Sequence, residues 1–140
     1  MVRREVKGEM VNVYYNVGSE DGKSKLISAP PRALYSGEIY ELFVTDDKSA
    51  KPGGSVKRHK ILGHFEVKQA GLIREGDLVS VKGRRVGKVA GYEPCKVLRA
   101  PEQAIIHIFA KTDKKILGSK ELGIELGDEV LFTPVDSKFT

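Results

Sequence analysis

Three histidines and one cysteine are the residues of this sequence best suited to catalysis or metal binding. His59 and His64 are five positions apart, and on a regular strand this spacing sends two side chains to opposite faces, which is poor geometry for one metal ion. A single thiol cannot build a thiolate zinc cluster by itself. The sequence therefore predicts no metal site and no cofactor.

The segment "EPCKVLRAPE" contains the one cysteine, Cys95, in a basic neighbourhood. Positive charge favours the thiolate form that a nucleophile needs, and an alternative interpretation is a ligand-binding or enzymatic pocket formed by Cys95, His107 and Tyr92. No motif supplies an oriented histidine, and phosphate-loop, dinucleotide-binding, nucleophile-elbow and zinc-helix patterns are absent. We therefore assign no catalytic residue, and the sequence favours a protein that is not an enzyme.

Two basic clusters form a second candidate site. The formal net charge is +5, and the cations gather at two places, Lys82, Arg84, Arg85 and Lys88 in one and Lys57, Arg58 and Lys60 in the other. If both clusters lie on one side of the molecule, their cations would neutralise phosphates and give salt-sensitive binding of nucleic acid or another polyanion. Basic hairpin tips also occur simply for solubility, and the only aromatic residue near the clusters is Tyr92.

The stretch "GDLVSVKGRRVGKVAGY", from Gly76 to Tyr92, resembles the KOW motif of ribosomal and transcription-factor barrels. In that motif a Gly-Asp-x-Val strand turns at basic and glycine residues into a Gly-x-Val strand. The resemblance covers these residues alone and departs from the motif in the turn. It implies RNA binding by Lys82, Arg84, Arg85 and Lys88.

The elements that would hold these residues are short strands. Apolar and polar residues alternate with period two in "VNVYYNV", "EIYELFV", "LVSVK" and "RRVGKVAGY", the last two forming a hairpin around Lys82-Gly83-Arg84, and glycine interrupts at strand-length intervals. No window shows a helical stripe, although "GSKELG" fits one helical turn capped by Ser119. We predict an all-β fold, a single small β-barrel or barrel-like sandwich over residues 1–140, with a mobile loop at about 45–60.

One phrase occurs twice in the chain, as "LIREGDLVSVKG" and "LGIELGDEVLFTP", with a looser third copy in "LYSGEIYEL". A glycine at positive φ turns the chain, and the neighbouring carboxylate accepts backbone N–H bonds in that turn. We therefore interpret Gly76, Asp77, Gly127 and Asp128 as structural turns that each begin a strand, and not as paired catalytic carboxylates.

The strand "AIIHIFA", residues 104–110, is apolar on both faces apart from His107. Because a small barrel has one interior, the second apolar face needs a cover, either another copy of the chain or the loop at 45–60. From this strand and the missing catalytic motifs we predict a non-catalytic interaction or assembly module that forms a homo-oligomer. No segment is apolar enough to span a membrane and no secretory signal is evident, so we expect a cytoplasmic protein.

Overall fold

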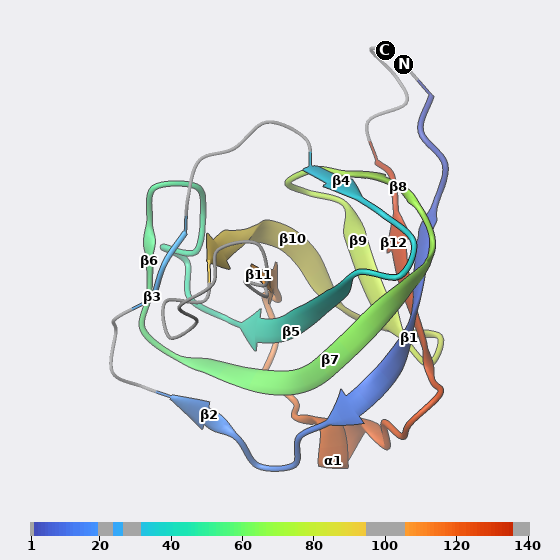
Figure 1. Cartoon of the computed structure of the whole chain (residues 1–140). Coiled ribbons are helices and arrows are strands. Elements are labelled where there is room, and N and C mark those ends of the chain that lie inside the picture. Colours follow the sequence, from blue (N-terminus) through green and yellow to red (C-terminus); the bar gives the residue numbers. More distant parts are fainter. Residues whose placement is uncertain (1, 20–23, 27–31, 95–105, 136–140) are drawn as a thin grey trace.

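The computed structural model of the chain describes residues 2–19, 24–26, 32–94 and 106–135 (Figure 1). Almost all of its regular structure is β-strand. In chain order the elements are β1 (Val6–Val13), β2 (Gly18–Ser19), β3 (Ser24–Lys25), β4 (Arg32–Leu34), β5 (Ile39–Thr45), β6 (Ser55–Val56), β7 (His59–Gln69), β8 (Gly71–Ile73), β9 (Leu78–Val81), β10 (Arg84–Pro94), β11 (Ile106–Lys111), α1 (Ser119–Leu122) and β12 (Glu129–Thr133).

Seven strands form a sheet that curls into a ring, in the order β1, β12, β9, β10, β11, β5 and β7. The ring closes because β1 pairs with β7 as well as with β12. All pairings in it are antiparallel except that of β11 with β5. The prediction of an all-β fold with little helix is confirmed, since α1, of four residues, is the only helix in the described ranges.

The inside of the ring is the main hydrophobic core. Strand β5 shows the pattern: Tyr40, Leu42 and Val44 alternate along it, are almost fully buried and belong to this core. Burial of such side chains contributes about 1.5–3 kcal/mol each. The alternation predicted for "EIYELFV" is therefore confirmed, and it decides which face of β5 points outward.

Strand β1 does not occupy the predicted segment. It covers Val6–Val13, with Val6 and Met10 buried inside the ring. Val11 and Tyr15, predicted to face the core, are 40% and 51% exposed. A β-bulge between Met10 and Asn12 breaks the alternation at Val11, so Val11 lies outside while Val13 packs partly against the main core.

The hairpin between β9 and β10 has the predicted position. Val81 pairs with Arg84, and the two residues between them, Lys82 and Gly83, have φ of 55° and 77°. Positive φ at both central residues is the mark of the turn that best matches the twist of a hairpin. The helical turn at α1 is also present, but Ser119 does not cap it, because its hydroxyl donates to the Leu62 carbonyl at 2.8 Å.

The repeated phrase builds the same turn at all three copies. Gly37, Gly76 and Gly127 have φ of 92°, 93° and 89°. In each turn the glycine N–H donates to a carbonyl of a neighbouring strand, at 2.8 to 2.9 Å, and that same neighbouring residue donates back to the carboxylate-bearing residue after the glycine. Each copy therefore attaches the start of one strand to another strand of the ring.

The carboxylate next to each glycine closes the turn. Asp77 Oδ2 accepts from the Arg74 N–H at 3.0 Å, and Asp128 Oδ2 accepts from the Glu125 N–H at 2.7 Å. Glu38 accepts from the backbone N–H three residues before it in the same way. Gly76 and Gly127 thus have the positive φ, and Asp77 and Asp128 accept the backbone N–H bonds, that the turn interpretation requires.

Gly76→Val and Gly127→Val are each expected to lower the free energy of unfolding by roughly 1–3 kcal/mol. A Cβ at either position would meet no atom closer than 3.7 Å, so the cost comes from holding a β-branched residue at positive φ. Urea denaturation measures the change. Gly127→Asn is the control and should lose less, because asparagine tolerates this conformation. Unchanged stability in both valine variants would contradict the turn explanation.

The outer face of β5 and β11 carries a second apolar cluster. Phe43 and Phe109 lie on it, at 4% and 0% exposure, packed with Leu26, Ala50 and Val56. The segment at 45–60 thus covers the outer face of β11 at Phe109 within one chain, which is the second of the two covers that the sequence allows. Ala104 and Ile105 lie outside the described residues. The oligomer itself stays a prediction, which sedimentation velocity tests.

The predicted mobile loop at about 45–60 carries several internal contacts. The Asp47 carboxylate accepts from the backbone N–H groups of Lys57 and Arg58, and the Ser49 hydroxyl donates to the Ser55 carbonyl at 2.7 Å. These bonds hold Ala50 and Val56 against the sheet. Mobility of the loop stays a prediction.

Candidate functional site

The strands that carry residues of the two sequence-predicted basic clusters, β10 and β7, lie in one ring with β11 and β5 between them. Lys88 on β10 is the cross-strand partner of Lys111 on β11, which in turn pairs with Thr45 on β5. The Thr45 hydroxyl donates to the Arg58 carbonyl at 2.6 Å, at the start of β7. Strand pairing and this hydrogen bond to the Arg58 backbone therefore connect the strand of the first cluster with the segment of the second. Lys88 and Lys111, like charges directly opposite each other, are unfavourable for the sheet by themselves.

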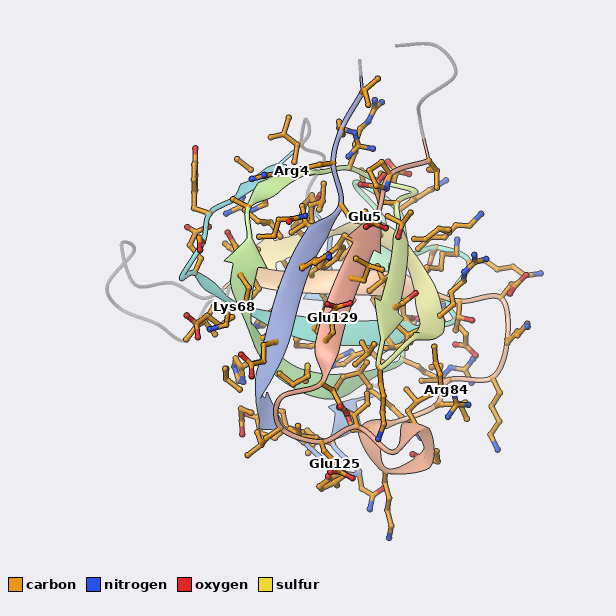
Figure 2. All side chains as sticks on the ribbon, turned by 90° about the vertical axis from the view of Figure 1, so that its right-hand side faces the viewer. Arg4, Glu5, Lys68, Arg84, Glu125 and Glu129 are labelled. Carbon is orange, nitrogen blue, oxygen red and sulfur yellow. The ribbon has the colours of Figure 1, made fainter. Side chains whose placement is uncertain are left out.

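The α1 region contacts a lysine of each cluster. Lys60 Nζ lies 3.5 Å from Glu121 Oε1 of this helix, and Lys82 Nζ donates to the Gly123 carbonyl at 2.9 Å. Figure 2 shows Arg84 near α1, at the end of the molecule opposite Arg4. We use the name basic end for the cationic side chains of these neighbouring elements: Arg58, Lys60, Lys82, Arg84, Arg85, Lys88, Lys111, Lys115 and Lys120.

Two hollows open on the basic end and meet at Asn16. The larger, about 570 Å³, is lined by Asn16, Val17, Gly18, Asp46, Arg58, His59, Lys60, Lys115 and Ile116. The smaller, about 360 Å³, is lined by Tyr15, Asn16, Lys120, Gly123, Ile124 and Glu125. The two hollows are therefore neighbours, on either side of Asn16.

Cations outnumber carboxylates in the larger hollow. Arg58 is paired with Asp46 at 3.0 Å, on the surface. Exposed pairs of this kind contribute little and exchange readily for another anion. Lys115, which also lines this hollow, makes no ion pair with any residue that the structure describes, and neither do Arg84 and Arg85.

An exposed aromatic ring lies next to these cations. Tyr15 lines the smaller hollow beside Lys120, and its hydroxyl donates to the Ile124 carbonyl at 2.9 Å, which holds the side chain in place. An aromatic face beside cations is the arrangement that stacks nucleobases. Tyr92, the aromatic residue nearest the clusters in the sequence, is instead 3% exposed inside the ring. The position of Tyr15 depends on β1 ending at Val13, which the strand pattern did not predict.

A row of polar side chains crosses the outer face of the sheet. Its five members come from β1, β7, β5, β11 and β10 and are successive cross-strand partners: Asn12, His64, Glu41, His107 and Glu93. Except for Asn12, which is half-buried, their side chains are 11% to 16% exposed. We call this set the histidine–carboxylate row.

Glu41 is the centre of the row. His64 Nε2 lies 3.1 Å from one carboxylate oxygen and His107 Nε2 lies 3.0 Å from the other. On the far side of His64, Asn12 Nδ2 is 3.0 Å from Nδ1, and His107 Nδ1 faces Glu93 at 3.5 Å. Donation from Asn12 places the proton of neutral His64 on Nε2, directed at Glu41.

The two imidazoles keep Glu41 ionised. Burial by itself would raise the pKa of this carboxyl, but the hydrogen bonds from His107 and His64, together with their charges, outweigh burial and lower the pKa to about 2. Phe43 connects the row to the larger hollow, since its ring stacks on His107 at 4.5 Å and contacts His59 at 4.8 Å.

His59 and His64 occupy the same face of the sheet, which corrects the prediction of opposite faces. A β-bulge in the pairing of β7 with β5, between Leu42 and Phe43, adds one residue to β7 and resets the alternation. His59 packs on Phe43, whereas His64 contacts Glu41, so the two imidazoles do not converge. In the described part of the chain no group of three or more metal-ligating residues could hold an ion.

The pocket predicted from Cys95, His107 and Tyr92 is not brought together. Tyr92 pairs with Ile108 and belongs to the inner core, whereas His107 pairs with Glu93 and lies on the outer face. The sheet itself separates the two side chains. Cys95 lies outside the described residues.

Most residues of the histidine–carboxylate row could not be recognised as a site from the sequence around them. Glu41 and Asn12 are single polar residues in alternating strands, where a polar residue on the outward face is ordinary. The one usable hint was His107 in an otherwise apolar strand. Its partners depend on which strands pair and in which register.

Comparison with known proteins gives a match to a family whose function is not known. A family model with the description "Family of unknown function (DUF6917)" matches residues 1–133. No curated protein and no solved structure matches the chain. Among the described residues, no helix has the length and apolar character needed to cross a membrane.

Proposed function

Since the chain belongs to this family of unknown function (DUF6917), we propose its role from its surface: the protein binds single-stranded RNA along the basic end. The observation that carries this proposal is that the α1 region contacts a lysine of each sequence-predicted basic cluster, Lys60 at Glu121 and Lys82 at the Gly123 carbonyl. A continuous strip of cations follows a phosphate backbone, whereas scattered surface lysines do not.

The two hollows, which share Asn16, would accommodate successive nucleotides of the RNA strand. The larger is lined by Arg58, Lys60 and Lys115, and the smaller places the Tyr15 ring beside Lys120. Phosphates lie against the cations while a base stacks on Tyr15. The resemblance of the β9–β10 hairpin to the KOW motif agrees with this choice of RNA. The role is that of a binding module, and self-association and a cytoplasmic location stay separate predictions.

The test is fluorescence anisotropy of a labelled single-stranded oligoribonucleotide at several salt concentrations. Wild-type affinity should fall linearly with the logarithm of salt. Neutralising Arg84, Arg85 and Lys88 to glutamine should make the slope shallower by about 2, because each phosphate contact on a single strand contributes about 0.7. Tyr15→Ala should weaken binding by roughly 5- to 100-fold, whereas Tyr15→Phe keeps the stacking ring and most of the affinity.

The matched control neutralises three cations away from the basic end, Arg4, Lys7 and Lys68, so that net charge changes equally. It should leave the salt slope nearly unchanged. An equal loss in both triple variants would mean that only net charge matters and would contradict a defined interface. Binding that is absent at low salt would reject the proposal outright.

A further inference from the structure

The opposite end of the ring carries an arginine that points inward. The short sheet of β4 and β8 lies at the end away from α1 (Figure 1). Arg32 and Leu34 alternate on one face of β4, and Leu34 is buried in the main core. The guanidinium carbon of Arg32 accordingly lies 5.9 Å from the ring centre of Tyr40 and 6.0 Å from that of Tyr92.

Two hydrogen-bond donors at this place have no acceptor. Arg32 Nε and the Tyr92 hydroxyl are both buried, and neither has a hydrogen-bond partner among the described residues. Tyr92 is 3% exposed, and burial, aided by the charge of Asp77, raises its pKa to about 12, so the hydroxyl keeps its proton. Folded proteins rarely leave buried donors unsatisfied, so these two donors call for an acceptor that the described residues do not supply.

The carboxylates nearby are already engaged. Asp77 binds both terminal nitrogens of Arg3, at 2.7 and 2.8 Å, and also closes its own turn. Glu38 Oε1 accepts from the Tyr40 hydroxyl at 2.7 Å and from the Tyr35 N–H. Arg32 makes no ion pair within the described ranges, so its charge has no counter-ion from the protein there.

We propose that Arg32 and Tyr92 form a binding site for the carboxylate group of a small organic acid, distinct from the RNA surface. The acid's oxygens accept from Arg32 Nε and from the Tyr92 hydroxyl, which satisfies both donors. An arginine side chain binds a planar carboxylate through two parallel N–H bonds. Arg32 as a whole residue is half-buried, whereas its Nε and the Tyr92 hydroxyl are buried, so the acid must displace the groups that cover these two atoms.

A carboxylate suits this site better than a phosphate. The Arg32 guanidinium, which makes no ion pair with a described residue, balances one negative charge, and the charges of Asp77 and Glu75 already act on Tyr92. These carboxylates repel a dianion more strongly than a monoanion. The aromatic rings of Tyr40 and Tyr92 also offer an apolar surface to the rest of an organic acid.

The experiment is isothermal titration calorimetry of the full chain with sodium acetate and sodium benzoate, and with inorganic phosphate for comparison. Saturable binding of at least one carboxylate is expected. Arg32→Gln should abolish it, and Tyr92→Phe should weaken it about 10- to 100-fold, because one hydrogen bond to a charged group is lost. Arg4→Gln, an exchange at the same end, is the control and should bind like the wild type.

Tyr92→Phe removes only a hydroxyl that has no partner among the described residues, so this variant should fold with an unchanged melting temperature. If Arg32→Gln fails to fold, Tyr92→Phe alone tests the proposed carboxylate site. The proposal is overturned if neither carboxylate binds, if Tyr92→Phe binds as tightly as the wild type, or if phosphate binds more tightly than both carboxylates. The triple variant of Arg84, Arg85 and Lys88 should bind the carboxylate normally, which separates this site from the RNA surface.

Discussion

Asp77→Ala is expected to lower the free energy of unfolding by about 3–5 kcal/mol, the cost of breaking a buried ion pair by removing one partner. The Asp77 carboxylate and the Arg3 guanidinium are 1% and 2% exposed and form two hydrogen bonds. Without Asp77, the buried charge of Arg3 loses this partner, and the Arg74 N–H loses the acceptor that closes the turn. Urea denaturation of both proteins measures the difference.

Asp128→Ala is the matched control. Asp128 closes the equivalent turn of the second copy, but its nearest cation, Lys82 Nζ, is 3.9 Å away and largely exposed. Its loss should cost only about 1 kcal/mol, as for a hydrogen bond in a turn. If Asp77→Ala costs no more than Asp128→Ala, the ion pair with Arg3 adds nothing to stability. The double variant Arg3→Ala, Asp77→Ala should recover part of the loss, since it removes both buried charges.

Glu41 is expected to make stability depend on pH below about 5. Its pKa is about 2 in the folded protein and 4.5 for the ordinary side chain. The unfolded chain therefore takes up the proton first as pH falls, which favours unfolding. The stabilisation by ionised Glu41 is fully present above the ordinary pKa and is lost between about pH 4.5 and pH 2. A shift of this size corresponds to about 3 kcal/mol.

The measurement compares the wild type with Glu41→Gln over this pH range. The difference in unfolding free energy should be constant near neutral pH, shrink as pH falls below 5, and approach zero near pH 2. Direct titration of the Glu41 carboxyl carbon by NMR provides a second readout. A difference that does not change between pH 5 and pH 2 would show that the histidines do not hold Glu41 ionised.

Much of the fold was predictable from sequence because its signals are local. Alternation in "EIYELFV" depends only on the period of a strand, and the inward residues Tyr40, Leu42 and Val44 are those observed. The turns at Gly76 and Gly127 depend on the φ freedom of glycine and on a carboxylate that reaches its own backbone. Such interactions span a few residues, so their residue types are enough to predict them.

Strand limits and faces were less predictable where the rest of the protein competes. The pattern of "VNVYYNV" predicted a strand whose valines face inward, but β1 begins at Val6 and fills the ring with Val6 and Met10. The bulge in β7 similarly places His59 and His64 on one face. A one-residue shift reverses every side chain of a strand, and only the packing of neighbouring strands selects the register.

The sequence by itself determined the all-β class, the hairpin of β9 and β10, the repeated turns and the existence of two cationic clusters. The tertiary structure alone decided that β10, β11, β5 and β7 lie side by side, so that Lys88 pairs with Lys111 across two strands and the Arg58 carbonyl accepts from Thr45. It also aligned His64, Glu41 and His107 and turned Arg32 toward Tyr92. These contacts join residues far apart in the chain, and pairing between distant strands is set by burial of the whole core rather than by any local pattern.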